Sequence, residues 1–330
     1  FTNPSPQYTI DDLRRVLNVH VEIMSKIPSI YRDLANRGQV ELIPVPYSHP
    51  LASIIADAGL TEDLEIHVEE SVRLFNDVFN YNPRGVWPAE QAVNEYVVEA
   101  FRNAGLTWTI TDRDVLGKTG VNIYDINNIG VPWYIDFPSG RIYIVFRETE
   151  LSNLISFQYA GWSVDNAVED LVNRILGYRN NAQGPRLVVI ALDGENPWEY
   201  YEEFGDTFLN KLYTRLSELQ NQGLIETITP GEFINRFSYT AKALPLGTYV
   251  YLNLAGKDIS NIPENSYGDG YSQLPRKNVQ AHLPEGSWAG GELAIWIGHR
   301  QENVALMWLV KARSDILSKL GLTSTSELYR

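Results

Sequence analysis

An apolar segment that ends in acids and a tryptophan runs from Arg186 to Trp198 and reads RLVVIALDGENPW. Its first half is rich in β-branched residues, which predicts a buried strand. The strand is followed at once by Asp193, Glu195 and Trp198. Parallel strands of α/β proteins present their functional side chains at their carboxyl ends. The segment is therefore predicted to end at an active site.

A second segment upstream has the same sequence pattern. Residues 85–90 read GVWPAE, again a short apolar entry followed by a tryptophan and an acid. If both strands belong to one parallel sheet, the carboxylates of Glu90 and Asp193 meet at one face. Cleavage of a glycosidic bond needs such a pair, one to attack or stabilise the anomeric carbon and one to protonate the leaving oxygen. The alternative is that each acid only caps the helix that follows its strand.

Strand and helix patterns alternate along most of the chain, which predicts an α/β fold with a mainly parallel sheet. Helices are predicted over residues 9–36, 61–79, 94–104, 163–178, 203–219 and 302–320, and strands over 40–45, 84–87, 108–111, 186–192 and 225–228. A turn at Pro138–Gly140 predicts a hairpin within residues 131–146. Periodicity fades after about residue 240. We therefore predict two parts, 1–240 and a loop-rich and helical part at 241–330.

Composition narrows the function. The 330-residue chain has a formal net charge of −14, which makes nucleic acid a poor partner. It has no apolar run long enough for a membrane span. Cysteine is absent, which excludes disulfides, thiolate zinc sites and a cysteine nucleophile. The five histidines lack HxxxH or HExxH spacing, so no metal and no cofactor are expected, and a metal-dependent deacetylase is the weaker alternative.

Three further residues are candidates for sugar binding, each with a plainer interpretation. His49 lies between two prolines after the 40–45 strand and could bind a hydroxyl, or it could be an ordinary loop histidine. Glu195 could bind a hydroxyl or raise the pKa of Asp193 by like-charge repulsion, or it could be a solvated charge. Trp288 stands between glycines in residues 286–291, GSWAGG, which suits the wall of a sugar subsite better than a core position.

These motifs resemble those of glycoside hydrolase family 57, in particular its amylopullulanase-like and α-amylase-like members. Residues 38–43 and 46–50 are similar to the second family motif. Residues 85–90 are similar to the third motif, whose glutamate is the nucleophile, and 192–198 to the fourth, whose aspartate is the general acid/base. Residues 146–157 are similar to a stretch usually written with FRD and LSD, with Glu148 and Asn153 here in place of the two aspartates. The resemblance covers roughly residues 8–320.

The resemblance implies a distorted seven-stranded (β/α) barrel followed by a mainly helical region. It implies a retaining enzyme that acts on α-glucans such as starch, pullulan and maltooligosaccharides, with Glu90 as nucleophile and Asp193 as general acid/base. An α-glucan transferase or a branching enzyme of the same family is the alternative. The implied sugar contacts are Glu41, His49, Trp87, Glu195, Trp198 and Trp288.

One departure from the family is a missing first motif, a His-Gln-Pro segment on the first barrel strand. We therefore expect a barrel without its first strand, whose open edge invites a separate N-terminal fragment or a second copy. A glucan-binding or assembly protein with impaired catalysis is a further alternative. A polymeric substrate, an acidic surface and the lack of cysteine favour an extracellular location, with the cytoplasm as the alternative.

Overall fold

The computed structural model describes residues 8–263 and 269–328, without the side chains of Asn196 and Asp269. Its helices are α1 (Ile10–Asn36), α2 (Ala52–Asp57), α3 (Thr61–Phe79), α4 (Glu95–Asn103), α5 (Arg113–Gly117), α6 (Ile126–Ile129), α7 (Thr149–Phe157), α8 (Val164–Asn181), α9 (Asp206–Asn221), α10 (Pro230–Phe237), α11 (Asp269–Ser272) and α12 (Arg300–Leu320). Its strands are β1 (Gly85–Val86), β2 (Trp108–Asp112), β3 (Trp133–Phe137), β4 (Gly140–Arg147), β5 (Lys242–Ala243), β6 (Gly247–Leu252) and β7 (Arg276–Ala281).

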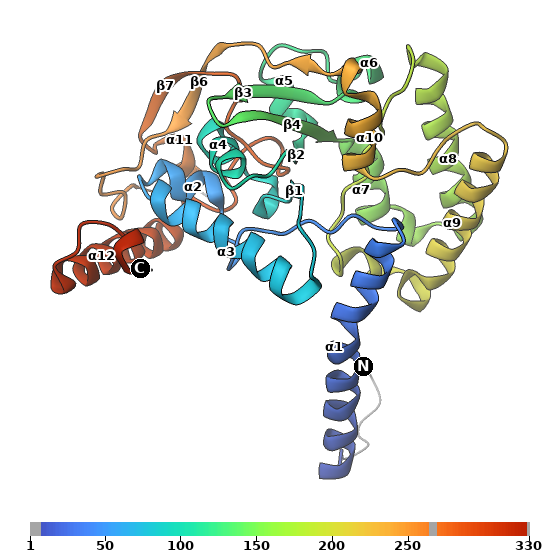
Figure 1. Ribbon diagram of the computed structural model, residues 1–330, viewed down its shortest axis with the longest axis horizontal. Coiled ribbons are helices and arrows are strands. Elements are labelled where there is room, and N and C mark those ends of the chain that lie inside the picture. The colour runs from blue at the N-terminus through green and yellow to red at the C-terminus, as the bar shows by residue number, and fades with distance from the viewer. Residues whose placement is uncertain (1–7, 264–268, 329–330) are drawn as a thin grey trace.

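A mixed five-stranded sheet forms the centre of the molecule (Figure 1). Its strand order is β1-β2-β4-β3-β5, and β1, β2 and β4 run parallel. The predicted hairpin is present as the antiparallel pair β3 and β4. The α/β class is confirmed, whereas closure of a seven-stranded barrel and the absence of its first strand stay predictions.

The main hydrophobic core lies between this sheet and helices α3 and α4. Every residue of β2 is buried, as expected of a parallel strand that is covered on both faces. Val86 and Ile144 of the sheet share one cluster with Leu64 of α3 and Phe101 of α4, and all four are fully buried. Burying side chains of this size contributes about 1.5–3 kcal/mol each. The packing holds the carboxyl ends of the parallel strands in a fixed place.

Two satellite cores flank the sheet. Helices α7, α8 and α9 pack together beside it, around residues such as Leu171 and Phe208 (Figure 1). On the other side, Ile54 of α2 packs with Leu252 of β6 and Leu306 of α12. The boundary near residue 240 stays a prediction, although residues from both sides of it share this cluster and β5 joins the main sheet.

Three predicted strands are not regular strands in the structure. No regular strand pairing is formed by residues 40–45, 186–192 and 225–228. Val189 makes one isolated bridge to Arg147. Pro44 O accepts one hydrogen bond, from Trp87 N at 2.9 Å. Apolar β-branched residues favour a strand only where a neighbour supplies a row of hydrogen bonds. Conversely, the β6–β7 hairpin lies in the region whose sequence predicts mainly loops.

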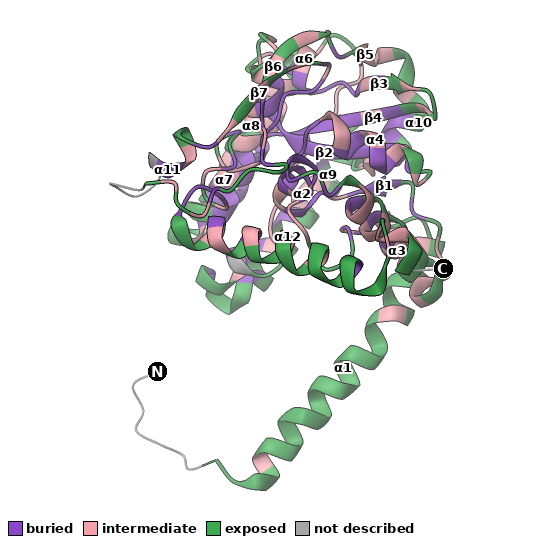
Figure 2. Cartoon of the chain, turned by 90° about the vertical axis from the view of Figure 1, so that its left-hand side faces the viewer, coloured by how far each residue is buried: buried purple, intermediate pink, exposed green. Residues whose placement is uncertain are grey.

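Helix α1 extends away from the rest of the molecule and none of its residues is buried (Figure 2). It begins with a capping box in which Thr9 and Asp12 bond each other's backbone N–H. No helix among residues 8–263 and 269–328 is long and apolar enough to cross a membrane.

Candidate active site

Glu90 follows β1 in a tight turn with unusual backbone geometry. Glu90 and Gln91 have φ angles of 56° and 51°, a left-handed conformation that costs a non-glycine residue on the order of 1–3 kcal/mol. Two backbone hydrogen bonds hold the turn, from Gln91 N to Pro88 O at 2.8 Å and from Trp288 N to Glu90 O at 3.2 Å. Such strain persists where the surroundings impose it, and it is concentrated at functional sites.

The two carboxylate oxygens of Glu90 face different groups. The Trp288 indole N–H donates to Oε2 at 2.9 Å, and His49 Nε2 lies 3.9 Å from Oε1. The rings of Trp288 and Trp87 meet edge to face, with centroids 5.5 Å apart. The Glu90 side chain is 26% exposed and that of His49 57%. An oriented carboxylate thus lies at the surface beside two indoles and an accessible imidazole.

The segment that carries Asp193 runs along the end of β4. Val189 bridges Arg147 in parallel, and Ala191 O accepts from Arg147 Nε at 3.0 Å. On the other side, Ala191 N donates to Ser152 Oγ at 3.2 Å. The chain then leaves the sheet, and Asp193 is half-buried. Asp193 therefore comes directly after a segment that is held by isolated hydrogen bonds, and not after the regular strand that its sequence predicts.

The Glu90 and Asp193 segments share neighbours in one small hydrophobic cluster. Val189 and Ala191 are buried in the same cluster as Trp108, and Trp87 packs against that cluster. The Arg147 guanidinium carbon lies 5.5 Å from the centroid of the Trp288 ring, while its Nε bonds Ala191. Arg147 therefore contacts both the group around Glu90 and the segment that leads to Asp193.

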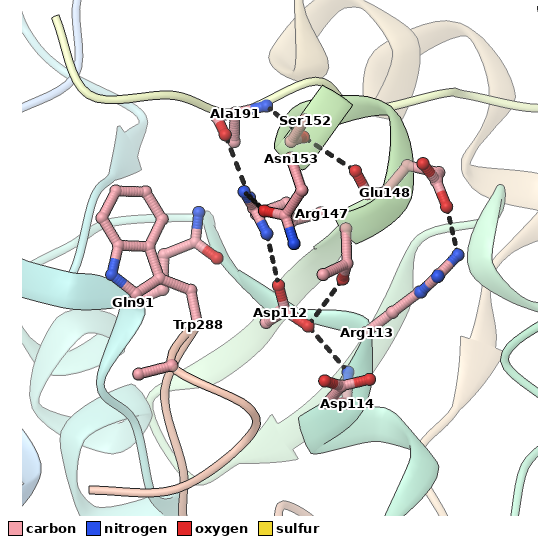
Figure 3. Close-up of polar contacts among 12 residues, drawn as sticks. Gln91, Asp112, Arg113, Asp114, Arg147, Glu148, Ser152, Asn153, Ala191 and Trp288 are labelled. Carbon is pink, nitrogen blue, oxygen red and sulfur yellow. Dashed lines mark hydrogen bonds and ion pairs between the residues drawn. The ribbon is translucent and has the colours of Figure 1, made fainter. Parts of the chain in front are cut away.

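Arg147 is held by a buried polar network at the carboxyl ends of β2 and β4 (Figure 3). Its Nη1 donates to Asp112 Oδ2 at 3.0 Å and its Nη2 to Asn153 Oδ1 at 2.8 Å. Burial raises the pKa of Asp112, while hydrogen bonds from Asp114 N, Thr149 and Arg147 act in the opposite direction. The network fixes the guanidinium, since each of its three nitrogens donates to an acceptor.

A second buried ion pair lies next to this network. Arg113 Nη1 donates to Glu148 Oε1, and Glu148 Oε2 caps α7 by accepting from Leu151 N at 2.5 Å. Glu148 therefore orders the start of α7, the helix that supplies Ser152 and Asn153. Burial followed by the charge of Glu148 raises the pKa of Tyr178 to about 12.

Glu41, another proposed sugar contact, is held by two hydrogen bonds. Its carboxylate accepts from Trp108 Nε1 at 2.9 Å and from Gly231 N at 2.8 Å. With Trp87, Trp108 of β2 and Ala191 it lines a cavity of about 170 Å³. The structure thus brings Glu41 to Trp87 through this cavity, and both oxygens of Glu41 already have donors.

The last two proposed sugar contacts lie in the chain that follows Asp193. Glu195 is exposed. Trp198 is half-buried and packs against Tyr201 and Phe208, with ring centroids 5.4 and 6.4 Å away. Sugar contact by either residue stays a prediction. Among residues 8–263 and 269–328, no group of three or more histidine, aspartate or glutamate side chains could hold a metal ion.

Sequence reasoning missed Asp112 and Arg147 as parts of this site. The available signal was positional, because each is the last residue of a buried parallel strand. A charged residue at such a place is costly unless it has a partner. Asp112 and Arg147 become partners because β2 and β4 are neighbours in the sheet, which the sequence does not show.

Comparison with known proteins identifies the family of this chain. A family model, "Glycosyl hydrolase family 57", matches residues 8–252. The chain is 24% identical over 226 residues to a 4-alpha-glucanotransferase of Thermococcus kodakarensis, a match that covers 67% of this chain but only 31% of that relative.

Solved structures show the same fold. The branching enzyme of Pyrococcus horikoshii matches with a TM-score of 0.62 and 15% identity, over 89% of this chain and 56% of that one. An α-amylase of Thermotoga maritima matches with a TM-score of 0.58 and 13% identity, over 71% and 55% of the two chains. Since the family model spans well over half of its residues, this chain belongs to glycosyl hydrolase family 57.

Proposed function

We propose that this chain carries the catalytic carboxylates of a retaining enzyme that acts on α-glucans. The observation that carries the proposal is the Glu90 carboxylate, which is oriented by the Trp288 N–H and lies beside His49 and Trp87. Aromatic faces next to a carboxylate suit a sugar ring, whose C–H face packs on an indole. Family membership supports the substrate class, because members are glycosyl hydrolases or transferases of α-glucans.

In the first step, the Glu90 carboxylate attacks the anomeric carbon while the bond to the leaving oxygen breaks. Asp193, in its acid form, gives its proton to that oxygen. In the second step, the Asp193 carboxylate takes a proton from water, and the oxygen of that water displaces Glu90. Two inversions give net retention. The geometry expected for this route is a separation of about 5–5.5 Å between the carboxyl groups.

Hydrolysis of the amylase or amylopullulanase type is our first assignment for the second step. Transfer is the alternative, with the hydroxyl of another glucan in place of water. The alternative rests on relatives named as a glucanotransferase and a branching enzyme. Incubation with maltoheptaose separates the two: hydrolysis yields only shorter sugars and new reducing ends, whereas transfer yields longer chains at a constant number of reducing ends.

Azide rescue tests the two residue roles. We expect Glu90→Ala and Asp193→Ala each to abolish or strongly reduce cleavage of an activated α-glucoside. Azide added to Glu90→Ala occupies the place of the nucleophile and yields the β-glucosyl azide. Azide added to Asp193→Ala attacks the covalent intermediate from the opposite face and yields the α-glucosyl azide.

Full activity of Glu90→Ala would contradict the nucleophile assignment. The matched control is Glu195→Ala, an exposed acid two residues from Asp193, which should yield no azide product. A wild-type chain that binds glucans but never cleaves them would instead support a binding protein with impaired catalysis.

A further inference from the structure

A pair of buried carboxyl groups lies outside the site described above. Asp57, the last residue of α2, is 1% exposed, and Glu285, on the loop that leads to Trp288, is 6% exposed. The proposed reaction uses neither of them. Two acids buried together are costly unless hydrogen bonds or protonation of one of them offsets the loss of water.

The pair joins four parts of the chain. Asn94 Nδ2 lies 3.3 Å from Asp57 Oδ1 and 3.4 Å from Glu285 Oε2, so one amide contacts both acids. Leu252 N, at the end of β6, donates to Glu285 Oε1 at 3.1 Å. Asn94 also caps α4 through Val97 N at 3.1 Å. Glu285 is therefore fixed to α2, α4 and β6 at once.

The loop from Glu285 to Trp288 runs beside the segment from Asn94 back to Glu90. Val93 and Gly286 exchange two backbone hydrogen bonds, of 2.8 and 3.0 Å. Two residues further along, Trp288 N donates to Glu90 O. The buried contact of Glu285 with Asn94 and the contact of Trp288 with Glu90 are thus the two ends of one short paired segment. A displacement of the backbone at Glu285 would therefore also displace the Trp288 indole.

The Asn94 amide brings the two carboxyl groups together, and Asp57 Oδ2 is buried with no hydrogen-bond partner among the described residues, so a proton between the two acids would satisfy it. Two ionised carboxylates repel strongly where water is excluded. Burial, and then a hydrogen bond with Glu285 and its charge, raise the pKa of Asp57 well above its usual range, while Lys277 acts in the opposite direction. The other titratable groups around the pair are Lys118, which donates to Glu285 O at 2.9 Å, and Glu95, Tyr251, Tyr271 and Glu292.

We propose that Asp57 and Glu285 form a positioning element, in which a proton shared by the two carboxyl groups keeps the Trp288 loop in register and its indole against Glu90. The consequence for catalysis rests on the proposed function. The position of the indole does not, and it can be measured without substrate.

The experiment follows the Trp288 indole N–H by NMR in the full chain labelled with ¹⁵N-tryptophan, with Trp288→Phe to assign the signal. Glu285→Leu removes the acceptors of Leu252 N and Asn94. We expect the Trp288 signal to move towards that of a solvent-exposed indole, while Trp133, which bonds Asn128 O at 2.9 Å in the main sheet, keeps its signal. Glu99→Leu on α4 is the matched control and should leave Trp288 unchanged.

Asp57→Asn is the decisive second variant, because its amide has the shape of the protonated acid and can donate to Glu285. It should keep the Trp288 signal of the wild type. In the wild type, the signal should shift as the pH rises through the raised pKa of Asp57, and in Asp57→Asn that shift should be absent.

An unmoved Trp288 signal in Glu285→Leu would overturn the proposal. The proposal also fails if Asp57→Asn moves the signal as far as Glu285→Leu does, or keeps the alkaline shift. Should Glu285→Leu not fold, the comparison of wild type with Asp57→Asn decides. If the chain cleaves glucans, kcat should fall at least tenfold in Glu285→Leu and stay at the wild-type value in Asp57→Asn. If it cleaves none, only the proposed function fails.

Discussion

The indole N–H of Trp288 donates a 2.9 Å hydrogen bond to Oε2 of Glu90, a residue 198 positions earlier in the chain. The two backbones are also joined by Trp288 N and Glu90 O. A carboxylate that must attack in one direction gains from a donor that fixes its rotation. The central acid of the proposed reaction is thus oriented by the C-terminal part of the chain.

Replacing Trp288 by phenylalanine removes that donor and keeps an aromatic face. A hydrogen bond to a charged group contributes about 1.5–3 kcal/mol, which corresponds to a loss in kcat/KM of about 10- to 100-fold. Kinetics on maltoheptaose measure it. The control is Trp308→Phe on α12, where the residue is 75% exposed, and which should leave kcat/KM unchanged. An unaltered kcat/KM in Trp288→Phe would contradict the proposal that Trp288 orients the Glu90 carboxylate.

His49 is expected to bind substrate beside Glu90. Its Nε2 lies 3.9 Å from Glu90 Oε1, and Ser48 and His49 both have left-handed φ angles, 66° and 53°. His49→Ala should lower kcat/KM while the protein keeps its unfolding midpoint, because the side chain is mostly exposed. His20→Ala on the exposed helix α1 is the control for loss of an imidazole. Equal kinetics in the two variants would exclude sugar binding by His49.

The buried pair of Arg147 and Asp112 should dominate the stability of the site. Their side chains are 5% and 0% exposed. Removing one partner leaves an uncompensated buried charge, so Arg147→Met should lower the free energy of unfolding by about 3–5 kcal/mol. Lys311→Met breaks a surface pair, 74% and 52% exposed, and should cost less than about 1 kcal/mol. Urea unfolding compares the two, and similar losses would contradict this account.

Glu62 should make the C-terminal turn sensitive to acid. Hydrogen bonds from Ser326, then Thr325, lower the pKa of Glu62 to about 2. Because its folded pKa lies below its unfolded value of 4.5, its stabilisation is present above pH 4.5 and is lost as the pH falls through about 2. The decrease in the free energy of unfolding caused by Glu62→Gln should therefore become smaller as the pH falls from 4.5 to about 2. Glu69→Gln, an exposed acid on the same helix, provides the baseline, and a loss independent of pH would refute the linkage.

Local chemistry explains which parts of the fold were predictable. Helices α1 and α4 begin close to their predicted starts because the side chains of Thr9 and Asn94 accept hydrogen bonds from nearby backbone N–H groups. Helix α3 also begins at its predicted start, Thr61, but without a side-chain cap. The β3–β4 hairpin follows from its turn. The β6–β7 hairpin was missed because its strands are half polar and 23 residues of chain, 253–275, separate them.

The sequence by itself determined the chemistry that is available: the acids Glu90 and Asp193, the tryptophans near them, and the alternation of strand and helix that places Glu90 after β1. Those properties are local, since each depends on residue type and short-range spacing. Only the tertiary structure decided which groups surround each acid. Trp288 reaches Glu90, Arg147 reaches Ala191, and Glu285 reaches Asp57 and Asn94 through contacts between distant segments. Such contacts follow from how the sheet and helices pack, a cooperative outcome of the whole core that no short motif contains.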